Sequence, residues 1–320
     1  MRCRYLFIPS LVGLLLFACQ GDSPSGKMAS TRDTPKPLAP VAIDLPQILQ
    51  RGKLIALTRY NANSYFIYRG QPMGYEYELL TLFAQHLGVD LEIKVPAKWD
   101  TLFNLLYRGE GDIIAANLTV TKERARKVKF AHAHTTTRQV LVQRKPQNWR
   151  QMKLHQIEKH LIRNPIQLIG KKVYVRRSSA YYARLVNLSE EIGGDIQIMP
   201  APEDLETEDL IRMVAKGEID YTVADENIAL INQAYYDNID VATPLGVEQR
   251  IAWAVRPNAP LLLQAINDWL QHMKSSGDPT YYVIYNKYYK NKRSFRERMR
   301  SEFFSKTGGK ISPYDSILQK

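Results

Sequence analysis

Two stretches of the chain repeat one alternation of short apolar strands and helical segments, and this repeat limits the folds open to the chain. The first opens with Gly52-Lys53-Leu54-Ile55 and the second with Gly170-Lys171-Lys172-Val173. Strands and helices that alternate at such short spacing are typical of a parallel α/β sheet. Two such units predict an α/β protein with two lobes and a cleft between them.

Local signals place the elements within each unit. Apolar residues at helical spacing predict a helix over residues 75–87 that ends at Gly88, because glycine is favoured as a C-terminal cap. The same kinds of signal predict the other elements. We expect strands over 53–58, 89–95, 112–116, 196–199 and 219–225, and helices over 99–107, 180–192 and 206–216. A strand over 251–255 and an amphipathic helix over 260–275 are predicted to return to the first lobe.

The strand that ends near Ala115 leads into a loop rich in small hydroxyl side chains. Ligands of parallel α/β sheets bind at the carboxyl ends of strands. Backbone amides there, the hydroxyls of Thr119 and Thr121 and the guanidinium of Arg124 suit a carboxylate, since an arginine fork binds it bidentately. The alternative is a surface loop in which Arg124 pairs with an acid such as Glu123.

The amino terminus has the pattern of an export signal. A basic start precedes an apolar run from Leu6 to Phe17, which is too short to span a bilayer. Leu16-Phe17-Ala18-Cys19 resembles a bacterial lipobox, so residues 1–18 are predicted to be a lipoprotein signal peptide and Cys19 the lipidated residue. Ordinary cleavage, which would release a soluble secreted protein, is the alternative.

Composition indicates how the rest of the chain is organised. The only other cysteine is Cys3, so the mature chain is predicted to have no disulfide and no cysteine metal site. No later segment is apolar enough to cross a membrane, and the Gly, Ser, Thr and Pro that follow Cys19 suit a tether. The predicted parts are a flexible tether at 19–44, first-lobe residues 45–142, a connector and second lobe at 143–248, a return to the first lobe at 249–290, and a basic extension at 291–320.

Positive charge is concentrated at the carboxyl end. The chain has a net charge of +12, and residues 287–320 hold ten Lys or Arg against three acids. One interpretation is a basic helix that lies on anionic lipid or on the cell-wall polymer. The other, slightly favoured, is a linker helix whose apolar stripe packs on the domain. Nucleic acid is a poor partner for an exported lipoprotein.

Neither a metal site nor a catalytic pair is predicted. His132 and His134 would face the same side of a strand, but zinc needs at least three protein ligands and no third is evident nearby. The acidic run over residues 203–209 contains enough carboxylates to suggest a glycosidase. A solvated helix start, where acids suit the positive helix end, is the preferred interpretation. We expect no cofactor.

With these residues in view, the region from about Leu45 to Tyr289 resembles the family-3 periplasmic solute-binding proteins. The resemblance rests on the runs at 74–79, 118–124 and 170–173, on Trp99 and on the strand that ends in Asp225. It implies a type II periplasmic-binding-protein fold with a hinge. The chain departs from the usual family pattern at Tyr75-Glu76-Tyr77-Glu78 and at residues 130–134, which leaves the identity of the ligand open.

The resemblance also implies roles for particular residues. Thr119 and Arg124 would hold the carboxylate of the ligand, and Asp225 would take its ammonium group. Donors at the start of a second-lobe helix and aromatic residues of the first loop would complete the site. The implied ligand-binding set is Tyr60, Tyr65, Phe66, Asn117, Thr119, Arg124, Ser178, Ser179 and Asp225.

A closer resemblance is to the solute-binding-like N-terminal domain of the membrane-bound lytic transglycosylase F family, on the runs at 75–79, 219–225 and 308–315. In that family a catalytic domain follows, and no residue here can be assigned as its catalytic glutamate. We expect a lipid-anchored binding protein on the periplasmic face of a membrane, the outer more than the inner, with an amino acid or muropeptide as ligand. Peptidoglycan or a separately encoded transglycosylase domain is a further partner to consider. The alternatives are the regulatory part of a lytic transglycosylase and the capture component of an amino-acid importer.

Overall fold

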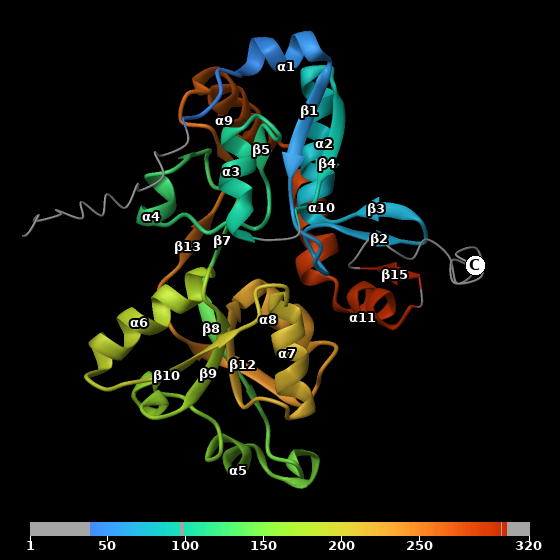
Figure 1. Ribbon diagram of the computed structural model, residues 1–320. Helices are drawn as coiled ribbons and strands as arrows, with labels where there is room; N and C mark the ends of the chain where they lie inside the picture. Colours follow the sequence, from blue (N-terminus) through green and yellow to red (C-terminus); the bar gives the residue numbers. More distant parts are fainter. Residues whose placement is uncertain (1–38, 97–98, 302, 306–320) are drawn as a thin grey trace, which may run out of the picture. The chain divides into compact units, whose positions relative to one another are not determined.

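A computed structural model describes residues 39–96, 99–301 and 303–305 (Figure 1). The predicted signal peptide, the lipidation site Cys19, most of the tether and the run at 308–315 lie outside the described residues. Among the described residues, no helix is both long and apolar enough to cross a membrane.

The first lobe is built on a five-stranded sheet with the strand order β4-β1-β5-β14-β6. Its strands are β1 (Lys53–Leu57), β4 (Asp90–Lys94), β5 (Ile113–Ile114), β6 (Lys129–Phe130) and β14 (Ala254–Val255). β1 pairs in parallel with β4 and β5, whereas β14 is antiparallel to both of its neighbours. The helices of this lobe are α1 (Leu45–Arg51), α2 (Tyr75–Leu87), α3 (Leu102–Tyr107), which follows the short turn η1 (Trp99–Thr101), α4 (Lys122–Ala125) and α9 (Pro260–Ser275).

Helix α2 shows why the local sequence gives this structure. Gly74 precedes it with φ 137°, and a Cβ there would lie 2.1 Å from the carbonyl oxygen of Ser64, so only glycine fits. The helix ends at Gly88 in the left-handed conformation, as predicted. Its inner face buries Leu79, Leu80 and Phe83 in the main core.

The second lobe has its own five-stranded sheet with the order β10-β9-β11-β8-β12. Its strands are β8 (Gln139–Arg144), β9 (Lys172–Arg176), β10 (Gln197–Ala201), β11 (Tyr221–Asp225) and β12 (Ile239–Pro244). The helical segments are η2 (Trp149–Gln151), α5 (Leu154–Glu158), η3 (Pro165–Leu168), α6 (Ala180–Ile192), α7 (Thr207–Lys216) and α8 (Glu226–Gln233). β8 pairs within this sheet from Gln139 onward, although the prediction assigned residues up to 142 to the first lobe. The lobe to which β8 belongs depends on its partner, β11, which lies about 80 residues later.

Two short strands connect the lobes. β7 (Thr135–Thr137) leads out of the first lobe, β13 (Gln249–Ile251) leads back, and they pair antiparallel (Figure 1). Two α/β lobes with two crossing segments form the predicted fold class, which is confirmed.

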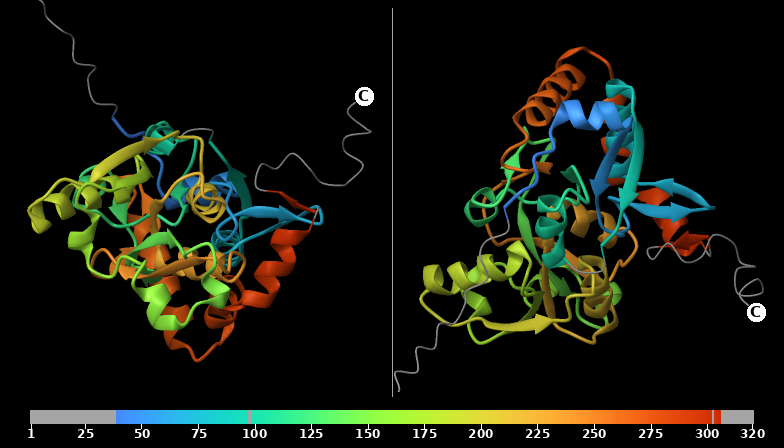
Figure 2. Two further views of the ribbon diagram at one scale, coloured as in Figure 1. Left: turned by 90° about the horizontal axis from the view of Figure 1, so that it is seen from below. Right: turned by 45° about the horizontal axis from the view of Figure 1, so that its top comes forward.

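The carboxyl-terminal segment packs against the domain. It comprises α10 (Thr280–Tyr285), the π-helix η4 (Asn286–Lys290), α11 (Lys292–Arg300) and β15 (Phe304–Ser305). β15 adds to the hairpin of β2 (Phe66–Tyr68) and β3 (Gln71–Met73), beside α11 (Figure 2). Phe295 is fully buried against Ala62 and Ile231. For residues 292–300, the structure therefore agrees with the second interpretation of this basic region, a helix whose apolar side packs on the domain.

Candidate ligand-binding site

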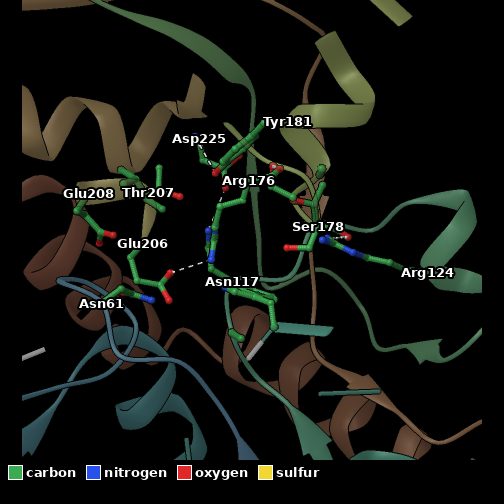
Figure 3. A pocket seen from close by; sticks show the side chains of 16 residues that line it. Asn61, Asn117, Arg124, Arg176, Ser178, Tyr181, Glu206, Thr207, Glu208 and Asp225 are labelled. Carbon is green, nitrogen blue, oxygen red and sulfur yellow. Dashed lines mark hydrogen bonds and ion pairs between the residues drawn. The ribbon is translucent and has the colours of Figure 1, made fainter. Parts of the chain in front are cut away.

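The carboxyl ends of strands from both sheets meet around one small cavity (Figure 3). The loop after β5 supplies Asn117 and Thr119, α4 supplies Arg124, and Arg176 and Asp225 end strands β9 and β11. Open α/β sheets bind ligands at such a place. The lining residues are Asn61, Trp99, Ala116, Asn117, Thr119, Arg124, Arg176, Ser178, Ser179, Ala180, Tyr181, Glu206, Thr207, Glu208, Asp225 and Ile228.

Arg124 is held by its own loop and points into the cavity (Figure 3). The hydroxyl of Thr121 accepts a hydrogen bond from the backbone N–H of Arg124 at 3.2 Å and caps α4. Among the described residues its guanidinium makes one hydrogen bond, from Nη1 to the Thr119 carbonyl at 3.0 Å. Burial lowers the pKa of Arg124. The guanidinium therefore keeps donors for a ligand anion in a partly dehydrated setting, where charge-assisted bonds are strong.

Asp225 lies on the opposite lobe and is 2% exposed. Its Oδ2 accepts a hydrogen bond from Asn117 Nδ2 at 3.0 Å, while Oδ1 has no partner among the described residues. Burial raises the pKa of Asp225 to about 7, even though Tyr181, Arg124 and Asn117 each act to lower it. A cationic group beside Oδ1 would supply the missing partner and favour the ionised carboxylate.

Asn117 joins the two lobes and adopts an unusual backbone conformation. Its φ is 52°, in the left-handed region, which residues other than glycine adopt only at a cost in free energy. Its backbone N–H donates to buried Glu76 at 3.1 Å, and Glu76 also accepts from Trp253 Nε1 at 2.6 Å. The first-lobe core thus fixes the residue whose side chain reaches Asp225.

Ser178 and Ser179 line the cavity, but their hydroxyls are already bonded. The Ser178 hydroxyl and backbone N–H both donate to Glu203. The Ser179 hydroxyl donates to the Arg176 carbonyl at 2.6 Å. The hydroxyls of these two serines would become available to a ligand only after these bonds exchange.

An ion cluster that the sequence did not predict closes one side of the cavity. Arg59, in the loop after β1, donates to Glu206 Oε1 from Nε at 3.0 Å and from Nη2 at 2.6 Å. Arg176 Nη1 lies 3.4 Å from Glu206 Oε2, and both guanidinium groups lie over the Trp99 ring at 5.9 and 5.2 Å. The arginine side chains are 7% and 6% exposed and that of Glu206 is 12% exposed, so the cluster is largely dehydrated.

This cluster corrects the interpretation of residues 203–209 as a solvated helix start. Glu206 is the N-cap of α7 and is ion-paired across the lobes. Glu208 is 3% exposed and accepts a hydrogen bond from the backbone N–H of Ala62 at 3.0 Å. Only the first part of the run, at Glu203 and Asp204, is exposed. The charge pattern alone could not show this, because the first-lobe partners Arg59 and Ala62 lie more than 140 residues away.

The structure places the predicted aromatic residues elsewhere. Tyr60 stacks on Tyr65 with ring centroids 5.1 Å apart, and neither lines the cavity. Phe66 is fully buried in the main core, between the rings of Tyr288 and Phe304. From this loop Asn61 reaches the cavity instead. Covering the ligand with these rings stays a prediction that would require a different arrangement of the loop.

The two histidines separate. His132 is exposed, and His134 is buried with Nε2 3.5 Å from Glu76 Oε1, because residues 131–134 do not form the regular strand that was assumed. Burial lowers the pKa of His134. Within the described ranges no group of three or more His, Cys, Asp or Glu side chains is placed to hold a metal ion.

Comparison with known proteins identifies the family. The bacterial extracellular solute-binding proteins, family 3, match residues 54–291. The chain belongs to this family. The fold of this solute-binding protein also agrees with a crystal structure of a mutant of ArgBP from T. maritima, which has a TM-score of 0.64 and 23% identity. That match covers 78% of this chain and 100% of the other, and the shared fold is the type II periplasmic-binding-protein fold.

Two relatives are membrane-bound lytic murein transglycosylases F. The one from Desulfosudis oleivorans is 44% identical over 76% of this chain and 50% of its own length. The one from Photobacterium profundum is 29% identical over 100% of this chain and 56% of its own length. This solute-binding protein thus spans about half the length of the curated relatives that it matches, over their solute-binding region.

Proposed function

We propose that this protein is a membrane-anchored, extracytoplasmic solute-binding protein that closes on a small zwitterion, an amino acid or a peptide derived from the cell wall, in a sensing or regulatory role. One observation carries the proposal. Arg124, which keeps guanidinium donors, and Asp225, which has an unpartnered carboxylate oxygen, line the same cavity from opposite lobes. A carboxylate on Arg124 and an ammonium group on Asp225 would satisfy both.

Thr119 and Asn117 would support these two contacts. Thr119 lines the cavity and its carbonyl holds Arg124, so its hydroxyl would add a donor to the proposed carboxylate. Asn117 already bonds Asp225 and would orient it toward the ammonium group. Ser178 and Ser179 would add donors once their present bonds exchange.

Entry of the ligand requires the lobes to separate. The cavity of about 50 Å³ has room for a few water molecules. The Arg59–Glu206 pair and the Ala62–Glu208 hydrogen bond tie the lobes together. A ligand that contacts both lobes favours the closed state because it binds that state more tightly, and β7 and β13 are the segments that would bend.

Thermal unfolding with amino acids and muropeptide fragments tests the proposal. A ligand that binds only the folded state raises the midpoint with concentration. We expect Arg124→Ala to abolish the shift and Arg126→Ala to leave it intact, because Arg126 is exposed at the end of the same short helix. An equal shift in the Arg124→Ala variant would refute the assignment.

A second candidate function is the regulatory part of a peptidoglycan lytic transglycosylase. The match to the solute-binding half of transglycosylases F favours it. Under this proposal the chain itself does not cleave murein and acts on a catalytic domain. Loss of turbidity of purified murein on adding this chain alone would contradict that role, whereas altered rates after mixing with a catalytic domain would support it.

The anchor is proposed from the lipobox-like sequence at Cys19, with the protein on the periplasmic face of the outer membrane. Expression of wild type and Cys19→Ala in a host that processes lipoproteins, followed by mass spectrometry and membrane fractionation, tests it. We expect a diacylglycerol mass on the wild-type amino terminus and release of the variant from the membrane. An unmodified wild-type amino terminus would contradict the anchor.

A further inference from the structure

A connector in the second lobe, residues 144–172, carries a large excess of positive charge that the proposed ligand site does not use. It contains eight Lys or Arg and one acid, a net charge of +7 in a chain whose total is +12. The one acid, Glu158, is held by Arg163. The side chains of Lys153, Lys159, Lys171 and Lys172 are exposed.

The strand register places this charge at the end of the second sheet opposite the ligand cavity. Gln139, at the start of β8, pairs with Asp225 at the cavity, whereas Arg144, at its end, pairs with Ile239. β9 likewise starts at Lys172 and ends at Arg176 on the cavity lining. Five residues of strand separate the two ends by about 16 Å. An occupant of the basic end would leave the cavity uncovered.

The basic end contains a groove with an aromatic residue in it. The groove is about 610 Å³ and includes Arg144, Lys145, Trp149, Arg150 and His160 in its lining. Lys145 Nζ lies 4.2 Å and Arg150 Cζ 4.9 Å from the centre of the Trp149 ring. Asp237 pairs with Arg150 and Asp240 pairs with Arg163, so two acids from outside the connector offset two of its eight positive charges.

Exposed aliphatic side chains accompany the charge. Leu154, at the start of α5, is 73% exposed, and Ile166 and Ile169 are 54% and 44% exposed. In Figure 1, α5 lies at the end of the second lobe away from β7 and β13. A soluble polyanion would be recognised by the charge alone. Aliphatic side chains and a tryptophan among lysines are instead the composition of a surface that sits at a lipid interface.

We propose that the basic end of the second lobe, formed by residues 144–172, is a docking surface for an anionic lipid bilayer. Lysines and arginines lie against the lipid phosphates, and Leu154 and Trp149 enter the headgroup region. The strand direction then turns the cavity end of the second lobe away from the bilayer. This contact is separate from the lipid anchor proposed at Cys19.

Sedimentation with vesicles tests the proposal without the anchor. The protein is residues 19–320 with Cys19→Ser, and the vesicles are phosphatidylcholine alone or an equimolar mixture with phosphatidylglycerol. We expect binding to the mixed vesicles only. A basic residue near an anionic surface contributes about 1 kcal/mol, so reversing two charges with Lys153→Glu and Lys159→Glu should weaken binding at least about tenfold.

Matched variants separate this surface from the total charge. Arg126→Glu and Lys129→Glu make the same charge change on exposed first-lobe residues and should weaken binding less than about threefold. Leu154→Ser should weaken binding, whereas Val247→Ser should not, because Val247 is 81% exposed but follows the cavity end of β12. Circular dichroism checks that each variant folds.

Three outcomes would overturn the proposal. The first is an equal loss of binding in the Lys153/Lys159 variant and the Arg126/Lys129 variant. Binding would then depend on the total charge of the protein or on another surface such as α11. The second is unchanged binding in the Lys153/Lys159 pair. The third is binding of the protein to soluble dextran sulfate but not to anionic vesicles, which would mean that the surface binds a polyanion.

Discussion

Replacing Asp225 by asparagine isolates the effect of one buried carboxyl group on both stability and binding. Asparagine has nearly the same shape and can still accept the hydrogen bond from Asn117 through Oδ1. It cannot ionise. The replacement therefore removes the proton equilibrium of the site while it keeps the link between the lobes.

The magnitude follows from the raised pKa of Asp225. In the folded protein this pKa is about 7, against 3.8 for an unperturbed aspartate. Between these values the folded state holds one more proton than the unfolded state, so the free energy of unfolding falls as pH rises. At about 1.4 kcal/mol for each pH unit, the whole interval corresponds to about 4 kcal/mol. The Asp225→Asn variant should lack this fall, and above pH about 7 both profiles should again run in parallel.

Urea unfolding of both proteins from pH about 4 to pH about 9 measures the difference directly. A constant offset is expected in addition, because the asparagine Nδ2 takes the place of an oxygen without a partner. Only the part of the difference in the free energy of unfolding that changes with pH is due to ionisation of Asp225. Any opening of the lobes that hydrates the ionised carboxylate would lessen the fall, so 4 kcal/mol is an upper limit. Profiles that run in parallel throughout, within about 0.5 kcal/mol, would refute the reasoning.

The same equilibrium affects ligand binding. Under the proposed function, the ammonium group of the ligand would pair with ionised Asp225, so wild type would release a proton on binding below pH about 7. As the pH is raised toward about 7, the affinity should increase by up to about tenfold for each pH unit, and above about 7 it should become constant. Calorimetry in buffers of different ionisation enthalpy would show the released proton. Binding without proton release at pH about 6 would contradict the assignment of the ammonium group to Asp225.

Three further predictions concern the contacts around the site. Glu206→Gln should destabilise the protein by about 3 kcal/mol in urea unfolding, because Arg59 and Arg176 would lose a buried carboxylate; a loss below about 1 kcal/mol would show that water already screens the cluster. Phe295→Ala should cost about 3 kcal/mol by opening a cavity, whereas Phe303→Ala, at a residue that is 38% exposed, should cost less than about 1 kcal/mol; equal costs would contradict the packing of α11. Asn117→Ala should be about 1 kcal/mol less stable than Asn117→Gly, since only glycine adopts φ 52° without strain; equal stability would mean that the loop relaxes.

Local patterns predicted the elements with strong periodicity. Helices α2 and α9 have the predicted bounds, because their apolar spacing and end signals are contained in the segments themselves. Strands β1, β9 and β11 are likewise apolar runs beside glycine or charged residues. The β2–β3 hairpin and β15 were missed, since β15 is a strand only by virtue of a partner more than 200 residues earlier.

The site was predictable in part for the same reason. Thr119 and Arg124 lie in the segment after β5 and Asp225 ends β11, and strand ends can be recognised from sequence. The ligand role of Asp225 was implied by the family resemblance. The burial of Phe66 could not be predicted, because it depends on Tyr288 and Phe304 from the far end of the chain. Arg59, Arg176 and Glu206 are single charges with no periodic signal, and only the closed arrangement of the lobes makes them a cluster.

The place of β14 in the first sheet has a consequence for how the chain assembles. β14 lies between β5 and β6, so this sheet stays incomplete until residue 255 has been synthesised. All strands of the second sheet lie within residues 139–244. Because domains fold as units and contacts distant in sequence form slowly, we expect the second lobe to become protease-resistant first. The first half of the chain would then be the last to finish folding, and an exported chain would depend longest on chaperones at its amino-terminal lobe.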